Sequence, residues 1–304
     1  MPFRSSFACL WCGTAYTTRG PDDLEGWAQL CPDCVGKAGD NGFLRFRLHE
    51  ALAERGAARR APEGAPAESS AAGPATPAED LGREMIDYYA ARAPEYDDWY
   101  LRRGRYSHGP IHDAAWDAEL DAAGRWLDAR PIRGEIVELA AGTGWWSPLL
   151  ASRGELSLYD ASDAPLARAR ERLVAHGLRA HLHVRDAWAE PDRQVDALFA
   201  GFWLSHVPAD RLPEFLALIR RWLKPGGVFA FIDSLDDPES GTIDRVAPID
   251  GVSVRRLADG RTFRVVKVYH AADTLSGALT AAGFEGVSVT TTGRFFLLGE
   301  GRAS

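Results

Sequence analysis

Short apolar runs alternate with helical segments between residues 135 and 233. Helical patterns fill residues 164–177 and 208–227, and the second ends on Lys-Pro-Gly-Gly, a sequence that stops a helix. Such alternation predicts an α/β domain in which helices cover a mostly parallel sheet. The runs that we expect to form strands are EIVELA (135–140), ELSLYD (155–160), HLHVR (181–185), VDALFA (195–200) and GVFAFID (227–233).

A low-complexity stretch divides the chain of 304 residues. Between Glu54 and Asp80 the sequence is dominated by Ala, Pro, Gly, Ser and Glu, which supply too few large apolar side chains to offset the entropy of ordering. We therefore expect a flexible linker over residues 51–82. It would separate a cysteine-bearing module, residues 1–50, from a larger domain, residues 83–304.

The module carries two CxxC pairs, Cys9/Cys12 and Cys31/Cys34, separated by 18 residues. Each pair can direct two thiolates at one metal ion, and the spacing is typical of a tetrahedral structural zinc site. A redox-active pair and chance spacing are the alternatives. Because protein ligands would fill all four positions, we expect zinc to stabilise the module and to take no part in catalysis.

Charge and cysteine usage restrict the partners and the environment. The net charge of −8, and the five basic against six acidic residues within 1–50, disfavour nucleic acid and make a protein the better partner for the module. The first residues do not resemble a signal peptide, and no apolar run is long enough to span a membrane. With cysteines suited to metal binding, these features predict a cytoplasmic protein.

A glycine-containing turn follows the first expected strand. It reads Glu138-Leu-Ala-Ala-Gly142-Thr-Gly144, at the strand end where open α/β sheets bind ligands. An ordinary strand-to-helix connection would look the same. The next two strands, however, end near Asp160 and Asp186, whose carboxylates could bind ribose hydroxyls and an adenine amino group. The three strand ends together favour a nucleoside site.

These residues resemble the class I S-adenosylmethionine-dependent methyltransferases over residues 83–304. The family's acid-x-Gly-x-Gly-x-Gly motif corresponds to Glu138-x-Ala140-x-Gly142-x-Gly144, with alanine in place of the first glycine. The resemblance implies a Rossmann-like sheet with helices on both faces and a β-hairpin cap, preceded here by a small zinc-ribbon-like module. It implies these cofactor contacts: Glu138, Ala140, Gly142, Gly144, Asp160, Asp186, Ala187, Trp188, Tyr96 and Arg92.

The last two of these contacts lie in YYAARAPEYDDWY (88–100), which resembles the family's leading helix. In the family this helix folds over the cofactor, so Arg92 and Tyr96 are candidate lid contacts. The alternative is an amphipathic helix that packs its tyrosines on the sheet edge.

His206 lies in FWLSHVP (202–208), directly after the fourth expected strand. It could act as a general base for a hydroxyl group or donate a hydrogen bond to an anion. A histidine bonded to backbone at the strand end is the alternative. An ionised phosphonate or carboxylate oxygen needs no base, whereas a phenol or alcohol would require His206 to take its proton.

A basic segment, SVRRLADGRTFRVVKVYH (253–270), interrupts the acidic chain. Asp259-Gly260 is typical of a two-residue hairpin turn, which would place Arg256 opposite Phe263. Strand alternation then puts Arg256 and Lys267 on one face among valines and Phe263. Burying two cations is costly unless an anion pairs with them, so we expect an anionic substrate here. Snorkelling of both side chains to the rim of the sheet is the alternative.

This hairpin, the glycine turn and FWLSHVP resemble the phosphonate O-methyltransferases of dehydrophos-type biosynthesis and related bacterial small-molecule enzymes. There a basic pair on the hairpin binds the substrate's anionic group, which corresponds to Arg256 and Lys267, and a tyrosine of the leading region corresponds to Tyr106. The resemblance implies O-methylation of a small anionic metabolite, a phosphonate or carboxylate, in bacterial natural-product biosynthesis. His206, Arg256, Lys267 and Tyr106 are thus the candidate catalytic residues.

Two other functions fit the same sequence. The chain could be an N- or O-methyltransferase of RNA or protein, with the zinc module presenting the substrate. It could also be a non-catalytic protein that binds the cofactor and recruits a partner through the module. The relatives that carry the resemblance have no cysteine module in front, which leaves a different substrate or a partner open.

Overall fold

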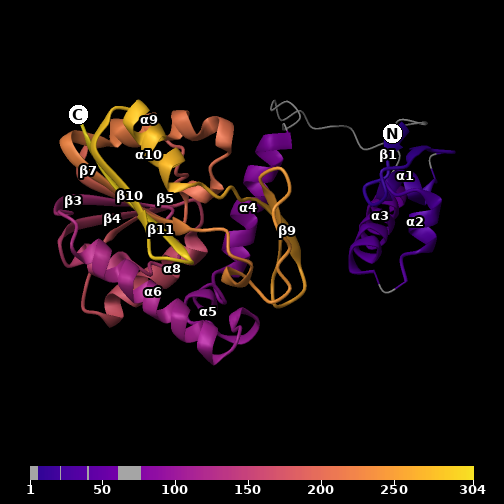
Figure 1. Cartoon of the computed structure of the whole chain (residues 1–304), viewed down its shortest axis with the longest axis horizontal. Coiled ribbons are helices and arrows are strands. Elements are labelled where there is room, and N and C mark those ends of the chain that lie inside the picture. The colour runs from indigo at the N-terminus through magenta and orange to yellow at the C-terminus, as the bar shows by residue number, and fades with distance from the viewer. Residues whose placement is uncertain (1–5, 21, 40, 61–76) are drawn as a thin grey trace. The chain divides into compact units, whose positions relative to one another are not determined.

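The computed structural model describes residues 6–20, 22–39, 41–60 and 77–304. Their contacts form two compact units, Met1–Ala72 and Gly73–Ser304. The first holds the four cysteines. The second holds the α/β sheet (Figure 1).

The cysteine unit is built from two short strands and three helices. Leu30, Leu44 and Ala51 are buried with three of the cysteines in its core. This core is small, which fits a unit that needs a further source of stability. Its elements are β1 (Ser6–Ala8), β2 (Ala15–Thr17), α1 (Leu24–Ala28), α2 (Pro32–Gly36) and α3 (Gly42–Arg60).

The linker expected over residues 51–82 is too long at both ends. Helix α3 continues to Arg60, and α4 (Pro77–Arg92) begins before residue 82, so only residues 61–76 of the expected linker lie outside the described residues. The physical reason is that ALAERGAARR (51–60) consists largely of strong helix formers. Its first residue, Ala51, is anchored in the core of the unit.

The larger unit contains a seven-stranded sheet in the order β10-β11-β7-β6-β3-β4-β5. Strands β3 to β7 run parallel, whereas β11 is antiparallel to both β7 and β10. The expected strands all form, and the Lys-Pro-Gly-Gly sequence lies at the start of β7. The strands are β3 (Gly134–Leu139), β4 (Gly154–Asp160), β5 (His181–Val184), β6 (Val195–Gly201), β7 (Leu223–Ser234), β10 (Phe284–Thr291) and β11 (Phe296–Ala303).

Helices cover both faces of this sheet and create two apolar cores (Figure 1). Successive side chains of a strand point to opposite faces, so Ile136 joins the core under Trp116 and Val137 joins the core under Trp222. Among the described residues no helix is both long and apolar enough to cross a bilayer. The covering helices are α6 (Pro110–Asp128), α7 (Ser147–Ala151) and α8 (Asp163–Ala175) on one face, and α9 (Leu212–Trp222) and α10 (Ala272–Ala281) on the other.

Two further segments flank the carboxyl ends of the strands. Helix α4, followed by α5 (Asp97–Tyr100), packs against the hairpin formed by β8 (Val252–Arg256) and β9 (Thr262–Val266). Glu84 of α4 accepts a hydrogen bond from Arg264 Nε at 2.8 Å, and Tyr88 packs on Phe263. Short 3-10 helices complete the unit: η1 (Gly104–Tyr106), η2 (Leu204–His206), η3 (Ala209–Arg211) and η4 (Pro238–Ser240).

The contact between β11 and β7 gives a test of the sheet. A Cβ atom at Gly299 would lie 2.1 Å from Cζ of Phe231, whereas a Cβ at Gly277 of α10 would meet nothing within 4 Å. We expect Gly299→Ala to destabilise the protein by about 2 kcal/mol because the buried ring must move. Gly277→Ala should stabilise it by about 0.5–1 kcal/mol. Urea denaturation of both variants checks this, and equal stabilities would contradict the packing.

Candidate active site

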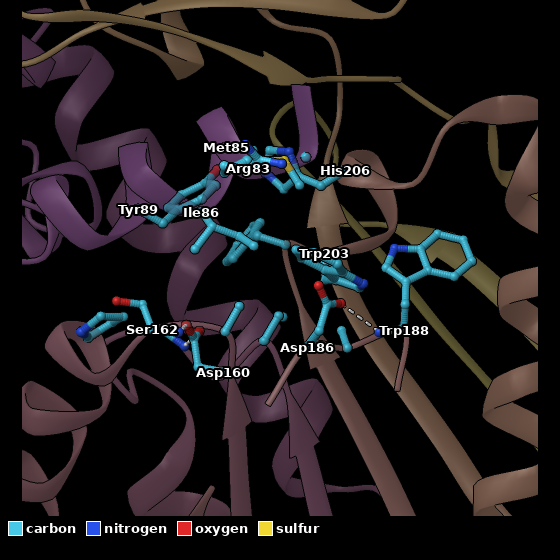
Figure 2. Close-up of a pocket in the computed structure, with 18 of the residues that line it drawn as sticks. Arg83, Met85, Ile86, Tyr89, Asp160, Ser162, Asp186, Trp188, Trp203 and His206 are labelled. Carbon is cyan, nitrogen blue, oxygen red and sulfur yellow. Dashed lines mark hydrogen bonds between the residues drawn. The ribbon is translucent and has the colours of Figure 1, made fainter. Parts of the chain in front are cut away.

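A cavity of about 490 Å³ lies beyond the carboxyl ends of β3, β4 and β6. Strand β3 pairs with β4 on one side and β6 on the other. Helix α8, which follows β4, and helix α9, which follows β6, cover opposite faces of the sheet and leave a crevice between them. In Figure 2, Asp160 and Asp186 lie on one side of the cavity, Tyr89 and His206 on the other, and Trp203 between them. The candidate residues that line it are Tyr96, Ala140, Gly142, Asp160, Asp186, Ala187, Trp188 and His206.

The glycine turn needs unusual backbone geometry. Ala140, Gly142 and Gly144 have φ values of 50°, 55° and 71°. A Cβ at Gly142 would meet no atom within 4 Å, so this position faces open space. A Cβ at Gly144 would instead lie 2.7 Å from Cβ of Ala169. Gly144 therefore allows α8 to approach the turn and is not itself part of the cavity wall.

Asp160 is held in place by two backbone groups. Its Oδ2 accepts a hydrogen bond from Gly142 N at 2.9 Å, and its Oδ1 accepts one from Ser162 N at 3.0 Å. Burial, reinforced by the charge of Asp186 and opposed by these bonds, raises the pKa of Asp160 to about 6. Each oxygen keeps a lone pair for donors in the cavity.

Glu138 lies beneath the turn and outside the cavity lining. It is fully buried and accepts a hydrogen bond from Ser147 Oγ at 2.6 Å. Burial raises its pKa to about 8. Glu138 therefore links β3 to the start of α7. Its contact with the cofactor stays a prediction, because the side chain lies outside the cavity lining.

Asp186 and Trp188 form a second wall at the end of β5. Trp188 N donates to Oδ1 of Asp186 at 2.8 Å (Figure 2), which orients the carboxylate. The guanidinium of Arg211 lies 3.9 Å from the ring of Trp188 and packs it against Phe215. Arg211 also lines the cavity and was not among the residues expected from the sequence.

Helix α4 supplies the opposite wall. Met85, Ile86 and Tyr89 line the cavity, as their three- and four-residue spacing on one helical face permits. From the sequence we expected only Arg92 and Tyr96 of this segment to contact the cofactor. The three- and four-residue spacing of Met85, Ile86 and Tyr89 could have identified these residues as well. Tyr96 does line the cavity, whereas Arg92 lies outside the lining, beneath the rings of Tyr96, Tyr88 and Tyr106.

The leading segment is fastened to the glycine turn. Asp97 of α5 accepts a hydrogen bond from Thr143 Oγ1 at 2.7 Å and pairs with Arg172 of α8. The ring of Tyr100 stacks on Trp145 at 4.1 Å. These contacts hold α4 and α5 beside the carboxyl ends of the strands.

Both ring nitrogens of His206 are occupied. Nδ1 lies 2.5 Å from the carbonyl oxygen of Val266 and must therefore carry the proton, while Nε2 accepts from the Tyr89 hydroxyl at 2.7 Å. Burial, followed by the charges of Lys267, Arg255 and Arg92, keeps the pKa of His206 well below its usual value. His206 is thus a neutral residue with a fixed tautomer, and its position does not suit a general base.

The register of the hairpin differs from the expected one by one residue. Arg255, not Arg256, pairs with Phe263, and Val252 pairs with Val266. Leu257 N donates to Arg261 O and Gly260 N to Leu257 O, which encloses a three-residue loop in place of the expected two-residue turn. A shift of one residue exchanges the two faces. Arg256 is consequently exposed, and the expected register, which put it on the same face as Lys267, is wrong. Its contact with a substrate stays a prediction that this geometry does not favour.

The inner face of the hairpin carries Arg255 and Lys267. Lys267 is 6% exposed, and its Nζ donates to Ser205 Oγ at 2.8 Å and lies 4.0 Å from Asp233. Burial, opposed by Asp233 and reinforced by Arg255, lowers the pKa of Lys267 to about 8. Tyr106 is buried, and its ring centroid lies 5.6 Å from Arg92. The structure thus gathers cations and tyrosine hydroxyls beside the cavity wall formed by Tyr89 and His206.

The four cysteines come together in the smaller unit. One sulfur from each lies within 4.8 Å of every other, and the Cys12 and Cys31 sulfurs are 3.6 Å apart. A tetrahedral ion with zinc–sulfur bonds of about 2.3 Å requires sulfurs about 3.8 Å apart. Burial and the neighbouring thiols raise the pKa of Cys34 to about 12, whereas backbone hydrogen bonds, opposed by burial, lower that of Cys9 to about 6. The residues therefore fit a zinc ion.

Comparisons with known proteins agree with this geometry. Residues 136–227 match the methyltransferase domain family. A ubiquinone/menaquinone biosynthesis C-methyltransferase of Proteus mirabilis is 31% identical over 184 residues, which cover 55% of this chain and 72% of the relative. The solved DhpI–SAM–HEP complex is 35% identical with a TM-score of 0.59, and the match covers 75% of this chain and all of DhpI.

A more distant structure shares the fold. The 1,6-didemethyltoxoflavin N1-methyltransferase of Burkholderia thailandensis is 16% identical with a TM-score of 0.50, over 80% of this chain and 94% of that one. The strand order, the glycine turn and the curated relative together confirm the expected family. This chain belongs to the class I S-adenosylmethionine-dependent methyltransferases and is an enzyme that uses S-adenosylmethionine as methyl donor.

Proposed function

We propose that the enzyme transfers a methyl group to an oxygen of a small anionic metabolite, a phosphonate or carboxylate. The observation that carries the proposal is the buried Lys267, which lies with Arg255 beside the cavity in a protein of net charge −8. A buried cation is costly unless an anion accompanies it, and Asp233 at 4.0 Å offsets only one charge. The similarity to DhpI and the resemblance to bacterial phosphonate O-methyltransferases support a role in natural-product biosynthesis.

In this proposal the cavity residues bind S-adenosylmethionine. Asp160 would accept hydrogen bonds from the ribose hydroxyls, and Asp186, Ala187 and Trp188 would enclose the adenine ring. Gly142 and Ala140 would let the methionine part approach the backbone. Tyr96 would close the cavity from the leading segment.

Bound S-adenosylmethionine supplies an electrophilic methyl group, which an acceptor oxygen takes in line as the new C–O bond forms, the C–S bond breaks and the sulfonium leaves as a neutral thioether. The acceptor group loses one negative charge in this step. Arg255 and Lys267 would hold the acceptor so that one oxygen faces the cavity, and positioning of this kind supplies most of the rate. Tyr106 would contribute its hydroxyl as a further donor.

An acceptor oxygen that is already ionised needs no base, which suits the state of His206. Its Nδ1 proton is committed to Val266 and its Nε2 to Tyr89. His206 would orient the Tyr89 hydroxyl toward the cavity. RNA is a poor alternative acceptor because the protein is acidic.

The Proteus relative favours a second candidate, methylation of carbon. An acceptor carbon must lose a proton when it gains a methyl group, so that reaction needs a base. Transfer from S-adenosylmethionine with a ¹³C-labelled methyl group distinguishes the two, because O-methyl and C-methyl carbons resonate far apart in NMR spectra. A C-methyl product would replace the proposed function.

For the smaller unit we propose a structural zinc ion bound by Cys9, Cys12, Cys31 and Cys34. The distances between the sulfurs and the small core support this proposal. Zinc would neutralise the thiolates and stabilise the fold, with no position left for a substrate.

Asp160 gives a test of the cofactor site. We expect Asp160→Asn to weaken binding of S-adenosylmethionine at least about tenfold, because a charged acceptor is lost. Binding to the unchanged enzyme should weaken as pH falls through about 6, since the carboxylate becomes protonated there. Calorimetry measures both, with Asp163→Asn on the exposed start of α8 as the control. Normal affinity in Asp160→Asn would contradict the ribose contact.

The hairpin register gives a test of the acceptor site. We expect Arg255→Gln and Lys267→Met each to raise KM for a phosphonate or carboxylate acceptor at least about tenfold, because a cation that pairs with the acceptor is lost. Affinity for S-adenosylmethionine should stay within about twofold, and acceptor binding should weaken as pH rises through about 8, where Lys267 loses its proton. Arg256→Gln, on the exposed face, is the matched control. A larger effect of Arg256→Gln would refute the observed register.

The metal content gives a test of the smaller unit. Elemental analysis of the purified chain should find one zinc ion per molecule, and Cys34→Ser should lose it and lower the unfolding temperature of this unit. His112→Gln is a suitable control, because it alters a second cluster of potential ligands whose acids, Asp237 and Glu239, already pair with Arg294. Metal-free protein with a disulfide in place of free thiols would favour the redox alternative.

A further inference from the structure

Arg92 is a buried cation without an acidic partner. It is 8% exposed, and its Nε atom is buried without a hydrogen bond. Among the described residues its guanidinium makes no ion pair, and it lies over the rings of three tyrosines, with the Tyr96 ring centroid 4.4 Å from Cζ. Aromatic faces stabilise a desolvated cation only in part, and this does not balance the loss of hydration. A missing anion would complete this environment.

The position of Arg92 indicates where that anion would lie. Arg92 follows Tyr89 by three residues in α4, and Tyr89 lines the cofactor cavity. Cζ of Arg92 lies 5.6 Å from the centre of the Tyr88 ring, and Tyr88 packs on Phe263, the strand partner of Arg255. The Tyr89 hydroxyl bonds His206, whose other ring nitrogen bonds the carbonyl of Val266, the residue before Lys267. Burial raises the pKa of Tyr88, which packs from α4 onto the hairpin, and the charges of Arg92 and Arg255 oppose this shift while that of Glu95 adds to it.

The balance of charge in this region is positive. Lys267 has Asp233 at 4.0 Å, and Arg245 pairs with Asp236. Neither Arg92 nor Arg255 forms an ion pair among the described residues, and Glu95, the acid that acts on Tyr88 with them, accepts a hydrogen bond from Ala258 N. One carboxylate or sulfonate would balance the charge of only one of these two arginines, whereas a doubly ionised group would balance both.

We propose that Arg92 is a third cationic arm of the acceptor site, and that Arg92, Arg255 and Lys267 together select a doubly ionised oxyanion over a singly ionised one. The inference rests on the proposed function and narrows its substrate class. It also replaces the expectation that Arg92 is a lid contact for the cofactor.

Ethylphosphonate and ethanesulfonate provide a matched pair of probes, because both are small tetrahedral anions and only the phosphonate ionises twice. Their affinities are measured by calorimetry on the full chain saturated with S-adenosylhomocysteine, so that no methyl group is transferred. We expect the unchanged enzyme to bind the doubly ionised phosphonate at least about tenfold more tightly than the sulfonate, since one more buried charge interacts with the three cations.

Substitution of Arg92 should remove this preference. In Arg92→Gln the two anions should bind within about threefold of each other, while the affinity for S-adenosylhomocysteine stays unchanged. Arg92→Lys, which keeps the charge, should retain a preference, and the exposed Arg256→Gln should behave like the unchanged enzyme. If Arg92→Gln keeps the full preference, or weakens S-adenosylhomocysteine as much as the anions, the inference is wrong.

The unchanged enzyme supplies an independent measurement if Arg92→Gln does not fold. Its preference for the phosphonate should disappear at a pH below the second ionisation of that group, and a preference that persists there would overturn the inference. Failure of the proposed function looks different. In that case the unchanged enzyme would bind neither anion and would methylate no phosphonate or carboxylate, whereas equal binding of both anions would remove only the selection for double charge.

Discussion

The pairing of β3 with β4 on one side and β6 on the other is the constraint on which the active site depends. Because the connections after β3 and β6 leave toward opposite faces, they diverge at the ends of these two strands, and a cavity opens there beneath α4. The same pairing brings Asp160, at the end of β4, beside the glycine turn, where Gly142 N fixes its carboxylate. Residues that are far apart in the sequence thus form one donor site without long loops.

Much of this donor site could be predicted from the sequence, because its signals are local. Five apolar runs predicted the parallel strands, and the side chains at three strand ends predicted the cavity residues Gly142, Asp160 and Asp186. The wall formed by α4 could be predicted less well. Met85, Ile86 and Tyr89 look like ordinary core residues of an amphipathic helix until the sheet places them over the cavity.

The acceptor side could not be predicted at the same level, since it depends on register and on unpaired charge. A three-residue loop at Ala258–Gly260, in place of a two-residue turn, moves Arg256 to the outside and Arg255 to the inside. Sequence alone favours the shorter turn at Asp-Gly, and both turns use a glycine. Likewise, nothing local to Arg92 or His206 reveals that one lacks an acid and the other has both nitrogens occupied. Those facts arise only when α4, η2 and the hairpin meet.

Helix α4 contacts two different parts of the larger unit. Through Tyr89 and Met85 it forms one wall of the cofactor cavity, and through Glu84 and Tyr88 it supports the hairpin that carries Lys267. The segment that follows it is fastened to the glycine turn by Asp97. A displacement of α4 would therefore widen the cavity and loosen the hairpin at once, so the contacts of one helix couple the openings of these two parts of the unit.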